Sequence, residues 1–278
     1  MAAWVSVAIV LGLMIGSFLN VVIHRLPLML EREWRSQSRE MLELPAADDG
    51  EKLTLVTPRS RCPHCGHPIS ALENIPLLSY AVLGGKCRGC KAGISLRYPA
   101  VELLTGLLTG LVAWQFGFTL AAFGGMLFCW LLISMTFIDL DHQLLPDNLT
   151  LPLLWLGLLF SLGNVYVSPA VAIIGAACGY LSLWLVFQGF KLATGKEGMG
   201  YGDFKLFAAL GAWLGWSMLP LVILLASGVG AVVGISMILF GDQKRSQPIP
   251  FGPFLAAAGL IAFLAGDPIV GWYLGLYR

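Results

Sequence analysis

Residues 120–138 read LAAFGGMLFCWLLISMTFI, an apolar run without a charged side chain. A helix needs about 20 predominantly apolar residues to cross the hydrocarbon core of a membrane. The whole chain of 278 residues shares this bias, with 57% hydrophobic and 12% charged residues. Soluble domains carry about 25% charged residues. Lipid must therefore be the solvent for much of this protein.

Similar apolar runs lie on both sides of this stretch, so we expect an all-α polytopic membrane protein. The expected spans, about eight in number, lie near residues 3–23, 99–117, 120–138, 149–166, 169–190, 204–216, 219–240 and 251–274. No Lys or Arg precedes Arg25, and no small-residue cleavage site follows the first run. The first span is therefore expected to be a retained helix rather than a signal peptide.

Positive charge is concentrated in one polar stretch, residues 24–98, which holds most of the 17 Lys and Arg residues. Eight alternating spans place two further basic links on the same side, those with Lys191, Lys196 and Lys205 and with Lys244 and Arg245; Arg278 falls elsewhere. Because cytosolic loops are enriched in basic residues, 24–98 is expected to be cytosolic and both termini periplasmic. The net charge of +1 gives no general attraction for nucleic acid.

The polar stretch contains two CxxC pairs, Cys62-Pro-His-Cys65 and Cys87-Arg-Gly-Cys90. Four thiolates with this spacing favour a closed, tetrahedral structural zinc site. Iron in a sulfur-only site is the main alternative metal, and free thiols or a redox pair remain further alternatives. Structural disulfides are rare in the cytosol, which favours a metal.

Other cysteines and histidines are not needed for this site. His64 and His67 lie near the first pair, but four cysteines already complete the coordination shell. Cys129 and Cys178 fall within apolar spans, where we expect small buried hydrophobic side chains.

Two groups of carboxylates lie beside apolar spans. Asp139, Asp141 and Asp147 follow the third span, and Asp203 opens the sixth at the end of a Gly-Met-Gly-Tyr-Gly-Asp run. Ionisable groups at membrane depth are costly and indicate function. The topology puts both groups on one membrane face, where a pair of aspartates that share one proton can activate water for peptide hydrolysis.

Structural roles compete with this interpretation. Asp141 and Asp147 can cap helices, which we favour for both, and Lys205 is a candidate ion-pair partner for Asp203. The glycine run is GxGxG rather than GxGxxG and follows no strand, which disfavours a nucleotide site. A proton-coupled transporter would need repeats that the sequence lacks, and a metal-bearing scaffold would leave Asp203 unexplained.

Several motifs occur together in this chain. They are Gly16-Ser17-Phe18-Leu19-Asn20-Val21-Val22, the paired CxxC motifs, Glu73-Asn74-Ile75-Pro76, Gly84-Gly85-Lys86-Cys87, Arg97-Tyr98-Pro99-Ala100-Val101-Glu102 and Gly200-Tyr201-Gly202-Asp203. With them the sequence resembles, over nearly its whole length, the type IV prepilin peptidases. These are bifunctional leader peptidases and N-methyltransferases with the GxGD signature of intramembrane aspartyl proteases.

The resemblance implies a set of roles. Asp139, seven residues before Pro146, and Asp203 would be the catalytic aspartates. The enzyme would cut the basic leader of prepilins and pseudopilins after a glycine at the cytosolic face, and would methylate the new N-terminus with S-adenosylmethionine. It would serve type IV pilus biogenesis or type II secretion from the bacterial inner membrane, with lipid as a further partner.

These expectations give a domain plan. Residues 1–23 form the first transmembrane helix, 24–98 a cytosolic metal-binding and methyltransferase module, and 99–278 a seven-helix peptidase domain. Glu73 and Lys86, in motifs beside the cysteines, are our candidates for methyl transfer; the alternative is that both are ordinary solvated surface residues.

Overall fold

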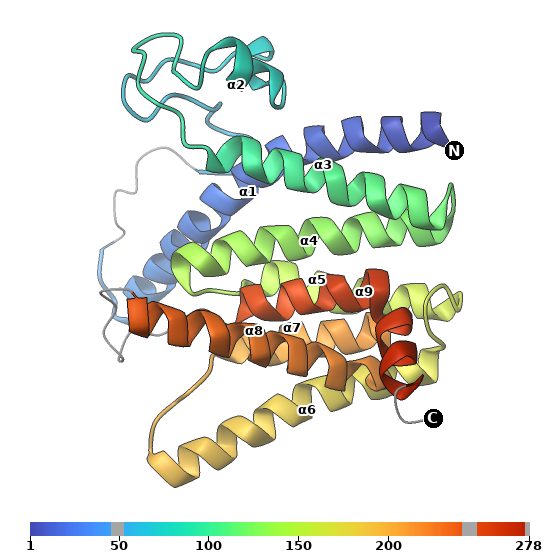
Figure 1. Ribbon diagram of the computed structural model, residues 1–278. Coiled ribbons are helices and arrows are strands. Elements are labelled where there is room, and N and C mark those ends of the chain that lie inside the picture. Colours follow the sequence, from blue (N-terminus) through green and yellow to red (C-terminus); the bar gives the residue numbers. More distant parts are fainter. Residues whose placement is uncertain (46–52, 241–248, 276–278) are drawn as a thin grey trace. The chain divides into compact units, whose positions relative to one another are not determined.

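The computed structural model describes residues 1–45, 53–240 and 249–275. The described chain is helical, and its only β pairing consists of two isolated bridges. It forms two compact units, Met1–Phe118 and Thr119–Arg278 (Figure 1). The basic residues Lys244, Arg245 and Arg278 lie outside the described residues.

The first unit is built on two helices that pack side by side, α1 (Ala2–Met41) and α3 (Arg97–Phe116) (Figure 1). Small residues bring them together. A Cβ at Gly12 would lie 2.6 Å from the Thr109 Oγ1 atom, so only glycine permits this approach. Close approach through small residues stabilises helix pairs in lipid.

Helix α1 extends far beyond the expected end of the first span at residue 23 and reaches Met41. The extension is charged but remains helical through Pro27, and side chains one turn apart pair along it, as Glu31 does with Arg35. Such i,i+4 pairs support a helix that is exposed to water. Residue 23 is therefore not a structural boundary.

Residues 53–96, here called the cysteine module, connect α1 to α3. Their only regular elements are a 3-10 turn, η1 (Leu72–Asn74), and a short helix, α2 (Leu78–Val82). The Arg25 guanidinium, buried in α1, donates hydrogen bonds to the carbonyls of Thr54 and Pro58 at the start of the module. The module thus starts from a fixed point on α1.

The second unit contains six helices. They are α4 (Leu120–His142), α5 (Asp147–Leu162), α6 (Pro169–Thr194), α7 (Tyr201–Leu214), α8 (Leu219–Phe240) and α9 (Gly252–Gly275), with a 3-10 turn, η2 (Trp216–Met218), after α7. Helix α7 is the central element, because it packs against α5, α6, α8 and α9 and most of its residues are buried.

The central position of α7 depends on close contacts at both of its faces. The backbones of Gly175 in α6 and Gly211 in α7 approach so closely that neither position has room for a Cβ. On the α5 side, the Trp213 indole N–H donates to the Leu153 carbonyl at 2.8 Å. These contacts fix the C-terminal end of α7 against α5 and α6.

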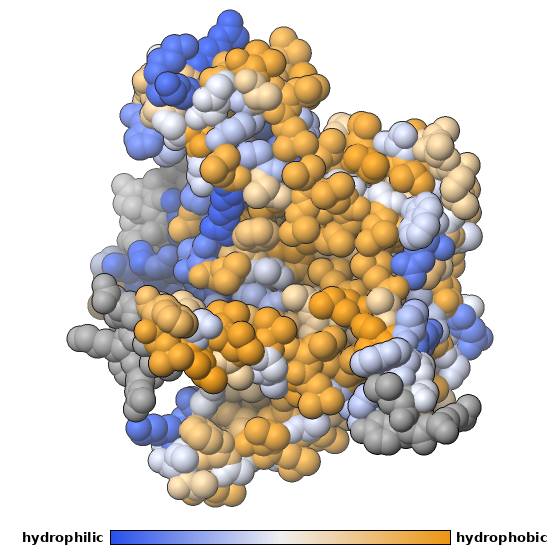
Figure 2. All heavy atoms as spheres, in the orientation of Figure 1, coloured by the Kyte–Doolittle hydropathy of each residue, from blue (hydrophilic) through white to orange (hydrophobic). Residues whose placement is uncertain are grey.

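Six of the described helices are long and apolar enough to cross a membrane, by length and composition: α1, α3, α4, α6, α8 with η2, and α9. Large hydrophobic side chains such as Leu107, Trp155 and Leu185 are exposed on the helices, and Figure 2 shows hydrophobic residues over most of the helix surface. Helices α5 and α7 match two predicted spans but have only 16 and 14 residues, fewer than the six candidate spans, so eight crossings remain a prediction.

The compact units also divide the chain differently from the expected domains. Helix α3 was expected to open a seven-helix domain over 99–278, but it packs against α1 in the first unit. The physical reason is the glycine-lined seam between α1 and α3, which hydropathy alone does not reveal.

Candidate functional site

Asp139 lies in the last turn of α4, with 5% of its surface exposed. The helix ends at Gln143, which takes the left-handed conformation and donates its N–H to the Asp139 carbonyl. The carboxylate accepts a hydrogen bond of 3.0 Å from the backbone N–H of Gly252, the first residue of α9. Asp139 is thus held between the end of one helix and the start of another.

Asp203 lies in the first turn of α7 and is 8% exposed. Gly200 precedes the helix with extended backbone, and its carbonyl accepts the Asp203 backbone N–H at 3.3 Å. A carboxylate in the first turn of a helix is favoured by the partial positive charge of the free N–H groups there. The start of α7 therefore favours a carboxylate at Asp203.

The two carboxylates come close together. The segments that carry Asp139 and Asp203 meet at Leu145. A Cβ at Gly202 would lie 2.7 Å from the Leu145 Cβ, and a Cβ at Gly252 would lie 2.5 Å from an Asp139 carboxylate oxygen. Two glycines thus permit the helix ends to converge on the acids, as the sequence predicted for the pair.

The other acids and Lys205 have different positions. Lys205 pairs with Asp147, its Nζ lying 2.6 and 2.8 Å from the two carboxylate oxygens, so it is not the partner of Asp203. Asp147 lies in the first turn of α5, but Pro146 is the cap residue and no side chain caps the helix, so its structural contact is the pair with Lys205 rather than the expected cap. Asp141 is exposed near the end of α4.

An apolar cavity of about 500 Å³ is lined in part by residues that lie close in sequence to Asp203 and to Gly252. Met199, from the glycine run before Asp203, and Phe251, next to Gly252, both line it. The remaining lining residues are mainly apolar side chains of α6, α8 and the start of α9, among them Leu183, Ile223 and Phe254. The cavity can accept an apolar side chain next to the two carboxylates.

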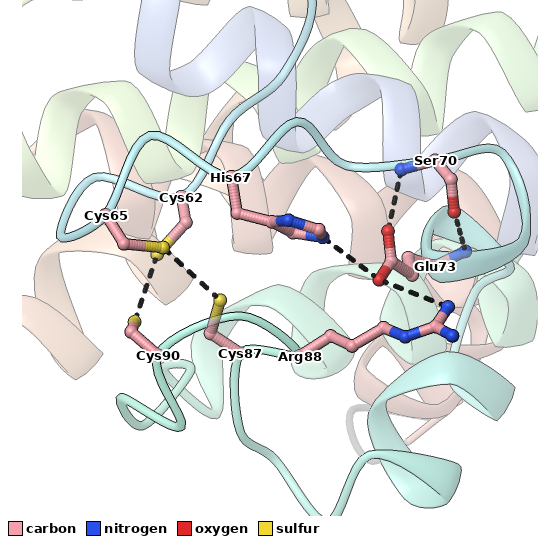
Figure 3. Close-up of polar contacts among 8 residues, drawn as sticks. All are labelled: Cys62, Cys65, His67, Ser70, Glu73, Cys87, Arg88 and Cys90. Carbon is pink, nitrogen blue, oxygen red and sulfur yellow. Dashed lines mark hydrogen bonds and ion pairs between the residues drawn. The ribbon is translucent and has the colours of Figure 1, made fainter.

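The four predicted metal ligands come together in the cysteine module (Figure 3). The Cys62 and Cys90 sulfurs lie 3.8 Å apart, the Cys65 and Cys87 sulfurs 3.9 Å apart, and all four lie within 4.8 Å of one another. Tetrahedral zinc with Zn–S bonds of about 2.3 Å places its sulfurs about 3.8 Å apart. The cluster therefore fits a tetrahedral metal ion.

The two CxxC loops share one backbone design. In the first, the Cys62 N–H donates to His67 and the left-handed residue is Gly66. In the second, the Cys87 N–H donates to Ala92 and the left-handed residue is Lys91. Each loop presents two thiols to the same point, as two halves of one closed site do.

Glu73 joins the two loops rather than standing free at the surface (Figure 3). One of its oxygens accepts the Ser70 N–H at 2.8 Å, and the other lies 3.3 Å from His67 Nε2 and 3.8 Å from Arg88 Nη1. The backbone N–H and hydroxyl of Ser70 lower the pKa of Glu73 to about 2. His67 belongs to the first loop and Arg88 to the second, so this carboxylate ties them together.

The remaining predicted residues divide between exposed and buried positions. Lys86 is exposed, and its backbone forms an isolated β-bridge with Gly93 beside the second CxxC pair. His64 is exposed as well. Cys129 is fully buried, as expected, but Cys178 is exposed on α6, so the expectation of burial was wrong for it.

Sequence reasoning missed two parts of these sites. Gly252 contributes a backbone N–H, which any residue except proline supplies, so only its position between Pro250 and Pro253 hinted at a special turn. The second part is Glu102, a buried carboxylate in α3 that accepts a hydrogen bond from the Leu77 N–H of the module.

Comparison with known proteins gives concordant results along the chain. Residues 10–116 match the bacterial Peptidase A24 N-terminal domain, and residues 126–235 match the type IV leader peptidase family. No solved structure matches.

Curated relatives match over nearly their full length. A "Prepilin leader peptidase/N-methyltransferase" of Stutzerimonas stutzeri is 58% identical over 99% of this chain and 96% of its own. Proteins of the same name from Pseudomonas aeruginosa and Neisseria gonorrhoeae are 57% identical (98% of this chain, 94% of the relative) and 51% identical (97% and 94%).

Proposed function

The chain belongs to the type IV leader peptidase family, and we propose that Asp139 and Asp203 form the catalytic pair of its peptidase. Its activities are cleavage of prepilin leaders and N-methylation. The observation that carries the proposal is the convergence of two buried carboxylates at the ends of α4 and α7, the positions at which the sequence predicted them.

The mechanism follows from the proximity of two acids. Two carboxylates at close range share one proton, because both cannot readily be charged together. The charged member draws a proton from water, and the neutral member donates one to the carbonyl oxygen of the scissile peptide. The N–H of Gly252 fixes one oxygen of Asp139, and the burial of both acids excludes competing solvent.

The apolar cavity beside the pair suggests how a substrate is held. We propose that it receives an apolar side chain of the segment that flanks the scissile bond. Met199 and Phe251 line the cavity and belong to the segments that lead to the two acids. A substrate side chain bound in the cavity would therefore position the peptide near the acids. Accurate placement of this kind supplies a large share of a catalysed rate.

For the metal we propose zinc at Cys62, Cys65, Cys87 and Cys90. The sulfur spacing and the sulfur-only donor set fit zinc, and four protein ligands leave no open position, so the role is structural. When bound, the metal supplies a crosslink between two loops. Metal analysis of the purified protein should give about one zinc per chain, and iron at that stoichiometry would replace the assignment.

The finer points of the activity are also proposals. The peptidase cuts after a glycine, and S-adenosylmethionine is the methyl donor for the new N-terminus of prepilins and pseudopilins. We propose that the module holds this soluble donor, with Lys86 at its exposed surface and Glu73 fixing the shape of that surface.

We further propose that the protein lies in the bacterial inner membrane, in contact with lipid, with residues 24–98 in the cytosol and both termini in the periplasm. The distribution of Lys and Arg supports this orientation. A cysteine probe near Ser38, on the exposed end of α1, should escape labelling from outside intact cells. Efficient labelling there would reverse the orientation.

One assay tests the peptidase proposal directly. The detergent-solubilised protein is incubated with a peptide that carries a basic leader, Gly-Phe and an apolar run, and the products are measured by mass spectrometry. A single cut after the glycine is expected, and no cut, or cuts elsewhere, would overturn the proposed specificity.

A further inference from the structure

A buried polar cluster joins the two helices of the first unit to the cysteine module. Ser17 and Asn20 come from α1, Asn74 and Leu77 from the module, and Glu102 from α3. The Asn20 amide donates to the Tyr98 carbonyl at 3.1 Å, and the Ser17 hydroxyl lies 3.5 Å from the Asn74 side-chain oxygen. Asn74 is exposed, so the cluster opens toward water at one edge.

Glu102 is the unusual member of this cluster. Its side chain lies about 7.5 Å along α3 from the first residue of the helix, and only 9% of the residue is exposed. Among the residues that the structure describes, no Lys, Arg or His pairs with it. Buried carboxylates without a cation are rare, because a charge that leaves water needs a compensating partner.

The protein groups around Glu102 satisfy only part of its hydrogen-bonding capacity. One oxygen accepts the Leu77 N–H at 2.9 Å, while the nearby Ser17 hydroxyl donates to the Asn74 side-chain oxygen. An ionised carboxylate accepts about four hydrogen bonds. Roughly three acceptor positions are therefore not used by the residues that the structure describes, and they remain for a ligand with several donors.

The backbone around the carboxylate is adapted to this arrangement. Leu77 adopts φ +59° and ψ −45°, a left-handed combination that a non-glycine residue rarely takes, and it does so while it donates to Glu102. On the other side, a Cβ at Gly16 would lie 2.7 Å from the Glu102 Cα. Backbone strain of this kind persists where surrounding structure enforces it, and it often marks functional sites.

We propose that Glu102 binds the free N-terminal amine of the cleaved substrate and so forms the acceptor side of the methyl-transfer site. This inference rests on the proposed function, because it concerns the amine that the methyltransferase activity must recognise. An N-terminal ammonium has one positive charge and three N–H donors, which complement the unpaired charge and free acceptor positions of Glu102. Asn74, the neighbour of Glu73, connects the cluster to the module that we assign to the methyl donor.

The chemistry balances with a sulfonium compound as methyl donor. The bound ammonium first transfers a proton to the Glu102 carboxylate and becomes a neutral amine. The nitrogen lone pair attacks the methyl carbon, a C–N bond forms, and the C–S bond breaks, leaving its electron pair on sulfur as a thioether. The product is a methylated ammonium, and the proton on Glu102 passes to water as the carboxylate pairs with this new cation.

A purely structural role is the competing explanation, in which Glu102 merely accepts the Leu77 N–H. The substitution Glu102→Gln separates the two explanations, because glutamine retains an oxygen that accepts this bond but carries no charge. Thr109→Val is the matched control, since Thr109 lies on α3 in the same seam with α1 and its hydroxyl bonds within its own helix.

The test measures binding of a peptide that begins at the mature N-terminus, with that terminus either free or acetylated. The wild type and Thr109→Val should bind the free peptide roughly tenfold or more tightly than the acetylated one, the scale of a charge-assisted hydrogen bond. Glu102→Gln should lose this preference and raise the KM of the peptide in methylation, while cleavage of full-length substrate and zinc content stay unchanged.

Two results would contradict the inference, and each has a separate meaning. If Glu102→Gln keeps the preference for the free amine, or loses zinc and cleavage together with methylation, Glu102 is structural. If the wild type does not methylate a precleaved peptide under any donor concentration, the proposed methyl-transfer function itself fails, independently of Glu102.

Discussion

Asp139 and Asp203 lie at the ends of buried helices, whereas the four cysteines lie on two loops of a module with little regular structure. The acids are positioned by backbone contacts, among them the Gly252 N–H and the close approach of Gly202 to Leu145. The thiols are positioned by short turns, and the Glu73 carboxylate links the two loops.

The two regions become rigid in different ways. Helix packing holds the carboxylates in place without a ligand, because an array of close contacts leaves few alternative positions. The module is too small to bury a large core, so the metal that we propose for the four cysteines would supply much of its folding free energy. The two regions should therefore respond to different perturbations.

The largest effect is expected at the carboxylate pair. Asp139→Asn or Asp203→Asn removes the proton exchange that hydrolysis requires, so the cleavage rate should fall by roughly 10²–10⁴-fold. The measurement is turnover of a prepilin peptide at equal amounts of folded protein. Asp147→Asn is the control, because Asp147 pairs with Lys205 outside the catalytic pair and should retain nearly full cleavage.

If Asp139→Asn keeps near-normal turnover, the pair is wrongly assigned and Asp141, which lies two residues further along α4, is the next candidate. A loss of turnover accompanied by loss of the folded protein would be explained by instability instead, and thermal unfolding of each variant distinguishes the two results.

Removal of the metal should affect the other region most. Structural zinc contributes about 10–16 kcal/mol of apparent binding free energy in small zinc domains, so chelation or Cys62→Ser should unfold the module. Hydrogen exchange should then rise across residues 53–96 and much less in α7. Cys178→Ser, at an exposed cysteine on α6, should retain the metal. A folded module in metal-free protein would contradict this prediction.

The apolar cavity offers a smaller and more specific test. Gly230 lines it, and a side chain there meets Phe254 at ordinary contact distance, so Gly230→Leu should fill the space without breaking the helix. We expect the KM of peptide substrates to rise roughly tenfold, the scale of an overpacked site. Gly228→Leu is the matched control, because Gly228 lies on the same helix in open space.

An unchanged KM for Gly230→Leu would show that the substrate does not use the cavity. Equal increases in both variants would attribute the effect to general disturbance of α8. Either result would leave the carboxylate pair intact as the catalytic centre, since neither glycine contacts it.

The smallest effect concerns Glu73, which links the two cysteine loops. Glu73→Gln should make zinc easier to remove at neutral pH. The pKa of this group falls from about 4.5 to about 2 on folding, so its contribution is complete above pH 4.5 and disappears as the pH drops toward 2. Because the cysteine ligands become protonated and release zinc from both proteins over that range, zinc retention against a chelator is compared at neutral pH, where the Glu73 charge is fully present. Equal retention in wild type and variant would contradict this role of Glu73.

Much of this organisation is predictable from the sequence. The apolar runs located the helices of the described residues, and six of these are long and apolar enough to cross a membrane, because lipid imposes length and composition on a helix that crosses it. The CxxC spacing identified four thiols that do meet. Acids next to apolar spans pointed to two groups of carboxylates, and the choice of Asp139 and Asp203 within them came from the family resemblance and stays a prediction.

Other features depend on packing that hydropathy does not encode. The extension of α1 to Met41 is stabilised by side-chain pairs along a charged segment, and the grouping of α3 with α1 depends on a seam of small residues. Gly252 acts through its backbone, and Glu102 meets the module through a residue with rare backbone angles. None of these four features produces a periodic pattern of residues that would reveal it in the sequence.

We propose that cleavage and methylation use separate regions of the chain, and the Asp203→Asn variant can separate the two activities. The Asp203→Asn variant is incubated with a sulfonium methyl donor and with either full-length prepilin or the precleaved peptide, and both reactions are followed by mass spectrometry. The account predicts that the prepilin stays uncut while the precleaved peptide is methylated at close to the wild-type rate. Cleavage of the prepilin, or loss of methylation from the precleaved peptide, would contradict it.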